Sequence, residues 1–449
     1  MKKAILILVS MLVVFVLQAQ DNYMEQWAQF RGPFASGIVD STNIPERWDV
    51  TSGRNIIWKT EIPGLGHSSP IIWDDKVFVT TAVPDSGVSN FKPGLYGSIS
   101  NIDTEPVQEY RVLCIDKNSG EILWDELSHK GVPKTKRHIK SSHANPTPAT
   151  NGKYVVAFFG SEGLYCYDFT GKQIWKKEFE KMKTGYFMAP SHEWGISSSP
   201  IIHDETVIIQ CDLLDSAGFI ATYDVRTGNE KWKVVRKELP TWSTPNVYEL
   251  KGKKIIVVNG YNHIGGYDFE TGEEIWKMRG GGDVPVPTPF FAHQMIYIHN
   301  AHGGQSPIYA IKMSAKGDIT LAPDSLSGEF VAWRWKRGGA YNPTSLVYDN
   351  FYYGQNMNGS LKCINAINGD LLYNEKLPDS KGVTSSVVAS DDKFYVCAEN
   401  GFVYVLKTGD KMELIAKNKM KDAIMATPAI SKDKFIIRTQ HYLFAIGEE

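Results

Sequence analysis

The chain has 449 residues, of which 42% are hydrophobic, 12% aromatic and 22% charged. This composition is that of a globular protein and excludes a chain that is disordered, collagen-like or coiled-coil throughout. The 48 Lys and Arg residues nearly balance the 50 Asp and Glu residues, and the formal charge of −2 gives no overall attraction to nucleic acid or anionic membranes.

Residues 1–20 have the features of a secretory signal peptide. Lys2 and Lys3 precede an apolar run from Ala4 to Leu17, and small or polar residues follow. The run is shorter than the ~20 residues of a membrane-spanning helix, which favours cleavage over anchoring. No later stretch is apolar enough to span a membrane, and no Cys near the cleavage site could carry a lipid. We therefore expect a periplasmic or secreted protein, with residues 21–54 as an N-terminal extension.

The five Cys residues are an odd number scattered along the chain, with no C-x-x-C and no adjacent pair. This pattern argues against a disulfide framework, a zinc ribbon and a covalently attached haem. Three of the Cys recur in similar apolar contexts, which indicates small core residues of equivalent strands.

The chain contains a repeated motif, Asp-x-x-(Thr/Ser)-Gly-x-x-x-Trp. It is complete at 116–124, 224–232 and 268–276, shortened at 168–175 and degenerate at 365–373. The motif predicts a hairpin in which Asp caps the turn, Gly takes a positive φ, and Trp packs between neighbouring sheets. The motif residues are Asp116, Gly120, Trp124, Gly171, Trp175, Asp224, Gly228, Trp232, Asp268, Gly272 and Trp276.

A second motif, (Ser/Thr)-Pro followed by an alternating apolar strand, marks eight starts. In units without loop insertions the starts are about 45 residues apart, as from Pro200 to Pro245. Each unit has the pattern of four antiparallel strands, which is typical of a β-propeller blade. The starts are Ser69, Thr147, Ser199, Thr244, Thr288 and Thr427, with degenerate copies at Thr344 and Ser386.

The eighth unit lacks its outer strand, because only three strands follow Pro428. Residues 55–60, which contain Trp58, look like an outer strand without a preceding blade, and pairing them with the last unit would close the ring. We therefore predict an all-β fold: an eight-bladed β-propeller of four-stranded antiparallel blades over residues 55–449, closed by the N-terminal strand. The alternative is seven blades and an extra hairpin.

These motifs resemble the pyrroloquinoline-quinone-type propeller repeat over roughly residues 55–449. The resemblance covers quinoprotein alcohol dehydrogenases and the non-catalytic propeller lipoprotein of the outer-membrane barrel-assembly machinery. Residues 27–33, Trp-Ala-Gln-Phe-Arg-Gly-Pro, look like the opening of secreted bacterial propellers. The chain lacks the vicinal Cys pair common in the dehydrogenases and the Cys needed for lipidation, so the resemblance implies the fold without choosing an activity.

Candidate ligand contacts lie just before the (Ser/Thr)-Pro starts, because the loops entering inner strands form one mouth of a propeller channel. A mouth that is both polar and aromatic suits stacking on a planar ring or a sugar. The structural alternative is that these residues only cap backbone groups and pack against neighbouring side chains. No metal site is predicted, because no spacing rule supports one. The candidates are His67, His143, Asn145, His192, Glu193, Trp194, Trp242, Tyr341 and Asn342.

Two loops near the first two blades stand out. An insertion over about 83–106 is rich in Gly, Pro and Ser and is expected to cover one face. The loop over 130–140 is basic and is interpreted as a solvated loop, with a phosphate, an anionic glycan or a partner as the alternative.

Three functions follow from these features. The first is an exported cell-envelope protein that binds or scaffolds a protein partner, because no catalytic set is recognisable. The second is an alcohol or sugar oxidoreductase that uses pyrroloquinoline quinone with calcium. The third is a glycan-binding or glycan-processing propeller, indicated by the aromatic mouth. We expect an envelope protein or a glycan as partner and no nucleic acid.

Overall fold

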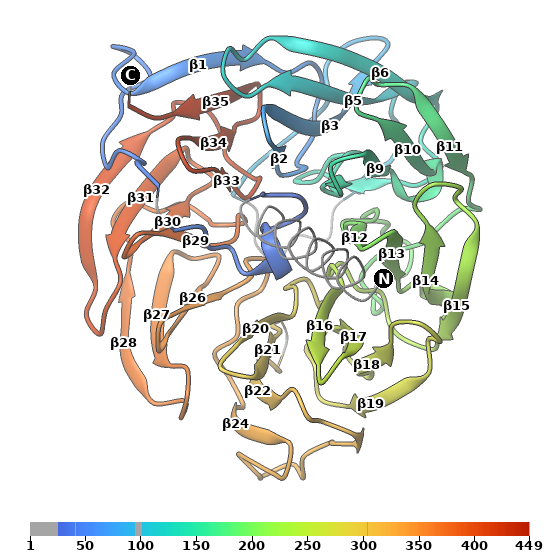
Figure 1. Ribbon diagram of the computed structural model, residues 1–449, viewed down its shortest axis with the longest axis vertical. Helices are drawn as coiled ribbons and strands as arrows, with labels where there is room; N and C mark the ends of the chain where they lie inside the picture. The colour runs from blue at the N-terminus through green and yellow to red at the C-terminus, as the bar shows by residue number, and fades with distance from the viewer. Residues whose placement is uncertain (1–25, 41, 95–100, 303, 449) are drawn as a thin grey trace, which may run out of the picture.

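The computed structural model describes residues 26–40, 42–94, 101–302 and 304–448. The predicted signal peptide lies outside these residues. Eight antiparallel sheets are arranged around a central axis, as Figure 1 shows, so the predicted eight-bladed β-propeller is confirmed. Among the described residues no helix is long and apolar enough to cross a membrane.

Each blade runs from an inner strand to an outer strand. The first four blades consist of β2 (Ile71–Trp73), β3 (Lys76–Pro84), β5 (Gln108–Asp116) and β6 (Ile122–Gly131); β8 (Ala149–Thr150), β9 (Tyr154–Phe158), β10 (Leu164–Asp168) and β11 (Gln173–Lys177); β12 (Ile201–His203), β13 (Thr206–Cys211), β14 (Gly218–Asp224) and β15 (Glu230–Arg236); and β16 (Asn246–Leu250), β17 (Lys253–Val258), β18 (Ile264–Asp268) and β19 (Glu274–Met278).

The next three blades repeat this order. They consist of β20 (Phe290–Ala292), β21 (Met295–His299), β22 (Ile308–Lys312) and β24 (Val331–Trp335); β25 (Leu346–Tyr348), β26 (Phe351–Gln355), β27 (Ser360–Asn365) and β28 (Leu371–Lys376); and β29 (Val388–Ser390), β30 (Lys393–Cys397), β31 (Phe402–Lys407) and β32 (Glu413–Lys419).

Blade 8 closes the ring as predicted. It contains β33 (Ala429–Ile430), β34 (Phe435–Arg438) and β35 (Tyr442–Ile446), and its outer strand is the N-terminal β1 (Ile56–Glu61), which pairs antiparallel with β35. The alternative of seven blades and an extra hairpin is therefore wrong.

A few short elements decorate the ring. A two-stranded sheet of β4 (Asn101–Ile102) and β7 (Arg137–His138) joins the insertion of blade 1 to the basic loop, and β23 (Gly317–Asp318) extends blade 4 in parallel. Three short 3₁₀ turns are η1 (Pro33–Ala35), η2 (Gly160–Glu162) and η3 (Leu214–Ser216).

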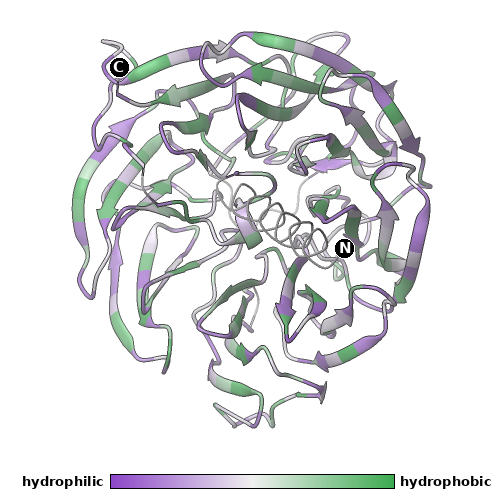
Figure 2. Cartoon of the chain, in the orientation of Figure 1, coloured by the Kyte–Doolittle hydropathy of each residue, from purple (hydrophilic) through white to green (hydrophobic). Residues whose placement is uncertain are grey.

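The core lies between the facing blades. In one cluster, buried side chains from β13 and β14 of blade 3 meet those from β17 and β18 of blade 4. The outer strands carry hydrophobic and hydrophilic residues side by side, as Figure 2 shows, because only one of their faces contacts a neighbouring blade. All five Cys are free and buried in these layers.

The Trp of the repeated motif joins one blade to the next. Trp232 on β15 lies over Gly272 in the turn of blade 4 and donates a hydrogen bond from Nε1 to the Phe269 carbonyl at 2.9 Å. Gly272 has φ +74°, and a Cβ there would lie 2.7 Å from the indole. The motif therefore needs Gly both for backbone conformation and for the close approach of the ring.

The same contact recurs around the ring. The indoles of Trp58, Trp124, Trp175 and Trp333 lie over Gly120, Gly171, Gly228 and Gly369, and each Nε1 donates to a carbonyl of that turn. Trp276 departs from the pattern: it is fully buried over Gly266 of its own blade, and Gly317 in the turn of blade 5 pairs with it in the register of β23 and β19.

The (Ser/Thr)-Pro starts form a second set of links, which we call the hydroxyl belt. At seven junctions the backbone N–H of the Ser or Thr in one blade donates to the hydroxyl of its counterpart in the next, at 2.9–3.1 Å. The belt consists of Ser69, Thr147, Ser199, Thr244, Thr288, Thr344, Ser386 and Thr427. It is open between Thr244 and Thr288, whose Oγ1 has no hydrogen-bond partner among the described residues.

We expect Trp232→Ala to lower the free energy of unfolding by about 2 kcal/mol. This loss is smaller than the ~3–5 kcal/mol lost when a fully buried aromatic residue is replaced by Ala, because Trp232 is only half-buried. Trp232→Phe, which keeps the ring but loses the bond to Phe269, should cost about 1 kcal/mol. Urea unfolding measures both, and an unchanged midpoint for Trp232→Ala would contradict the role of this contact between blades.

Candidate functional site

Residues 27–39 cross one end of the central channel and form a plug. In Figure 1 this dark blue segment lies in the middle of the ring. The plug is bound to blades on all sides of the axis, with Trp27 fully buried against blade 1. Its partners include Ile72, Thr150, Asn246, Ser345 and Val387.

Arg31 fixes the plug. Its guanidinium is fully buried, and its five N–H donors reach five backbone carbonyls, at 2.8–3.2 Å. Three of these carbonyls belong to blades 6 and 7 and two to the plug itself. Burial lowers the pKa of Arg31 to about 9. One side chain therefore links the N-terminal segment to blades 6 and 7.

Above the plug lies a cavity of about 240 Å³ on the channel axis. Phe30 of the plug lines it, and all eight residues of the hydroxyl belt do so as well. The residues two positions before each belt residue line it too, because successive side chains of an extended chain alternate in direction. This second set, which we call the upper ring, consists of His67, Asn145, Ser197, Trp242, Val286, Asn342, Thr384 and Met425.

One side of the cavity is aromatic. Trp194 lies between Tyr186, which is stacked on it at 6.1 Å between centroids, and Trp242 at 5.5 Å. Further round, His302 and Tyr341 are stacked at 5.4 Å. These residues come from loops along the stretch of the ring from blade 2 to blade 6, so flat aromatic faces gather on one side of the cavity wall.

The other side is polar. Lys140 lies 2.5 Å from Glu399, which also accepts hydrogen bonds from Thr384 and from the Gly94 N–H. His67 donates from Nε2 to the Lys140 carbonyl. Burial, with the charges of nearby arginines, lowers the pKa of His67 to about 3, so this imidazole is neutral at physiological pH. The wall therefore presents hydrogen-bonding groups without net charge.

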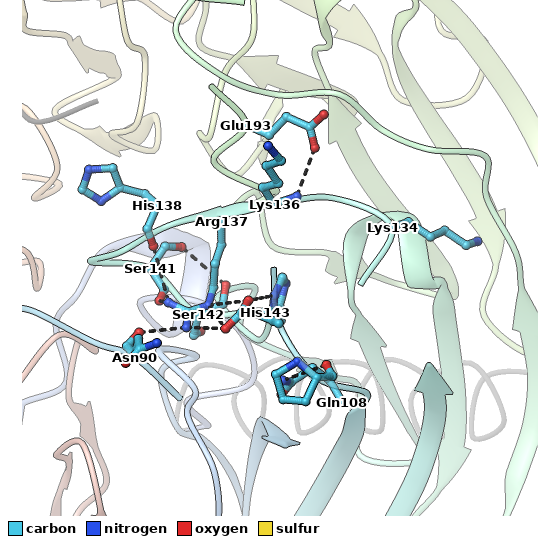
Figure 3. Close-up of polar contacts among 12 residues, drawn as sticks. Asn90, Gln108, Lys134, Lys136, Arg137, His138, Ser141, Ser142, His143 and Glu193 are labelled. Carbon is cyan, nitrogen blue, oxygen red and sulfur yellow. Dashed lines mark hydrogen bonds and ion pairs between the residues drawn. The ribbon is translucent and has the colours of Figure 1, made fainter. Parts of the chain in front are cut away.

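Six of the nine predicted contact residues line the cavity: His67, Asn145, Trp194, Trp242, Tyr341 and Asn342. His143, which Figure 3 shows near Arg137, does not line it. Its Nε2 lies 2.5 Å from Glu105, which also binds Arg137. Hydrogen bonds from His143 and Arg137 outweigh the burial of Glu105 and lower its carboxyl pKa. This ionic cluster holds the basic loop against the insertion of blade 1.

His192 and Glu193 also lie away from the cavity lining. His192 contacts Ser191, and Glu193 accepts from the Lys136 N–H (Figure 3) and pairs with Lys181. The basic loop is not simply a solvated face, because Arg137 and Lys140 are buried.

Besides members of the upper ring, the cavity residues that sequence reasoning missed include His138, Lys140, Tyr186 and His302. They come from loops without fixed spacing to a blade start, so no motif marked them. The upper ring, in contrast, had an available signal: its members lie two residues before each belt hydroxyl.

We expect the stability of the protein to fall more steeply with acid than that of a His67→Gln variant. The unfolded imidazole binds a proton below pH about 6.5, whereas the folded one, with a pKa of about 3, does not. Stability is therefore lost as the pH falls from 6.5 towards 3. Because His67 is partly open to the cavity, we expect about 1 kcal/mol of this loss by pH 4.5. Urea unfolding at several pH values measures it.

The exposed His293 provides the control for this prediction. His293→Asn should keep the wild-type slope of stability against pH. Equal slopes for the wild type and His67→Gln would show that His67 is protonated in the fold.

The cavity does not fit a calcium-bound quinone. Calcium in proteins takes six to eight oxygen ligands, carboxylates prominent among them. None of the described residues lining the cavity is Asp or Glu, and in the described part of the chain no three His, Cys, Asp or Glu residues group as metal ligands. The aromatic side fits a planar or cyclic ligand without a metal.

Comparisons with known proteins agree on the fold. The family model described as outer membrane protein assembly factor BamB matches residues 108–277 and 217–446, more than half of the chain. The quinoprotein alcohol dehydrogenase PedH of Pseudomonas putida is 22% identical over 234 residues, which cover 48% of this chain. The match spans only 36% of the length of that dehydrogenase.

Two solved structures have the same architecture. BamB from Moraxella catarrhalis has a TM-score of 0.57 at 12% identity, over 87% of this chain and 99% of its own. The quinohemoprotein alcohol dehydrogenase from Comamonas testosteroni has a TM-score of 0.60 at 11% identity, over 95% and 81%. At such low identity these likenesses show the fold alone.

Proposed function

Because the chain belongs to the propeller family described as outer membrane protein assembly factor BamB, we propose that it is a binding protein of the cell envelope whose ligand site is the central cavity. The location rests on the signal peptide expected at residues 1–20. The site rests on one observation: the cavity is closed by the plug on one side and lined by the hydroxyl belt and by a cluster of aromatic side chains.

This lining fits binding better than catalysis. Buried pockets with aromatic faces and a few convergent polar groups hold small cyclic ligands. Among the described lining residues Lys140 is the only Lys, Arg, Asp or Glu, and it is paired with Glu399. A general acid or base needs a titratable group within hydrogen-bond reach of the reacting atom, and the carboxylate nearest to Lys140 already accepts three contacts.

The test is ligand binding to purified residues 21–449, followed by indole fluorescence and calorimetry. The ligands are a panel of monosaccharides and pyrroloquinoline quinone with and without calcium. Trp242→Leu removes one aromatic face and should weaken binding at least tenfold. Trp335→Leu is the matched control, because this indole lies on the outer strand β24 and should leave affinity unchanged. No binding by any ring compound would overturn the proposal.

A quinone-dependent oxidoreductase is the second candidate, favoured by the match to PedH and by the aromatic faces. Calcium-dependent binding of the quinone, followed by dye-linked oxidation of an alcohol, would support it over the binding protein. The lack of carboxylates in the described lining argues against it.

A protein partner in the envelope is compatible with the binding proposal, and the name of the matching family favours it. Crosslinking in envelope fractions should recover one defined protein at native expression. Recovery of no specific partner would leave the cavity ligand as the only binding function proposed.

A further inference from the structure

The open junction of the hydroxyl belt lies in the cavity wall. Thr288 lines the cavity and is 1% exposed, yet its Oγ1 has no hydrogen-bond partner among the described residues. A buried hydroxyl without a hydrogen-bond partner is energetically unfavourable. Native structures rarely contain one unless a ligand or a water molecule supplies the missing hydrogen bond. At each of the other seven junctions the same hydroxyl accepts a backbone N–H.

The junction is held open by the chain around it. Pro285, Pro287 and Pro289 surround Thr288 and supply no N–H donors. The carbonyls of Pro285 and Pro287 are fixed by hydrogen bonds from Trp242 N–H and Ser243 Oγ of the preceding blade. Thr288 therefore cannot shift to join the belt without breaking these contacts.

The aromatic faces lie over this same sector of the ring. Trp242 precedes Thr244 on one side of the open junction, and His302 and Tyr341 lie beyond it in blades 5 and 6. A ring stacked on these faces would therefore place a substituent near Thr288. On the opposite wall the Lys140 ammonium lies 2.5 Å from Glu399 as an ion pair, and its Nζ makes no hydrogen bond with the described residues.

Charge and size restrict this ligand further. On the polar wall Lys140 and Glu399 form an ion pair without net charge and His67 is uncharged, so this wall offers no unpaired charge to a charged ligand. The cavity of about 240 Å³ is smaller than the ~300–1,000 Å³ of pockets for drug-sized ligands. One ring fits this volume better than a fused, multiply charged cofactor.

We infer that the cavity binds a neutral cyclic polyol, a single pyranose ring that stacks on the aromatic faces and hydrogen-bonds to Thr288 Oγ1 at the open junction. The inference rests on the proposed function, since it names the class of ligand for the same cavity. It assigns Thr288 Oγ1 as the hydroxyl that hydrogen-bonds to the ligand, because the other belt hydroxyls already accept a backbone N–H.

Calorimetry with residues 21–449 tests the inference. The probes are glucose, galactose, mannose, N-acetylglucosamine and myo-inositol, with glucuronate and glucosamine as charged counterparts. We expect at least one neutral probe to bind, and its charged counterpart to bind at least tenfold more weakly. Thr288→Val should weaken the neutral probe about tenfold, and Thr288→Ser, which keeps the hydroxyl, should retain it.

A second readout separates binding from folding. Thr288→Val removes no hydrogen bond in the free protein, so its thermal midpoint should match the wild type. Thr147→Val, which breaks a closed belt bond, should lower the midpoint. Tighter binding of glucuronate, or an unchanged affinity in Thr288→Val, would overturn the inference while leaving the proposed function intact. Binding of no ring compound at all would overturn both.

Discussion

Replacing the six residues of β1 by alternating Gly and Ser is expected to abolish the soluble monomer. The strand pairs with β35 along its whole length, so its loss exposes the backbone edge of an apolar strand. It also carries Trp58, which lies over Gly120 and donates to the Lys117 carbonyl at 2.8 Å. The change therefore opens both blade 8 and its junction with blade 1, and an open apolar edge promotes association.

Size-exclusion chromatography with light scattering measures this result. The control is the same replacement in residues 322–327, a mainly exposed stretch outside the strands, which should remain monomeric with an unchanged thermal midpoint. A β1 variant that elutes as a monomer and melts like the wild type would contradict closure of the ring by this strand.

Arg31→Met should lower the free energy of unfolding by about 3–5 kcal/mol, because each buried carbonyl left without a donor costs roughly 1–3 kcal/mol and part of the cost is offset. Methionine fills most of the volume, so the loss is in hydrogen bonding. Four buried carbonyls, including those of Thr344, Ser345 and Val387, and the part-buried carbonyl of Ser36 would lose these donors. The relief from burying a charge, seen in the pKa of about 9, offsets only part of this cost.

Arg31→Lys provides the comparison, because its ammonium has three donors and cannot reach all five carbonyls. We expect it to lie between the wild type and Arg31→Met in urea unfolding. Sugar binding should weaken in both variants, because Phe30 of the plug lines the cavity. If Arg31→Met unfolds at the wild-type urea concentration, the plug does not contribute to stability through this residue.

The repeats determined most of the site. His67, Asn145, Trp242 and Asn342 lie two residues before a belt position and therefore point to the axis. His143 lies four residues before Thr147, yet its side chain turns to Glu105 in the insertion of blade 1. The partner is remote in sequence and carries no motif, so position relative to the start could not exclude His143.

The sequence by itself determined the ring: hairpin motifs and hydroxyl starts are local signals, because turn conformation and strand alternation depend on residues a few positions apart. It also indicated the closing strand, since a blade without its outer strand needs one. Only the tertiary structure decided that residues 27–39 plug the channel, that Lys140 is buried beside Glu399, and that Thr288 is the open place in the belt. These features depend on contacts between segments far apart in the chain, and no spacing along one segment encodes them.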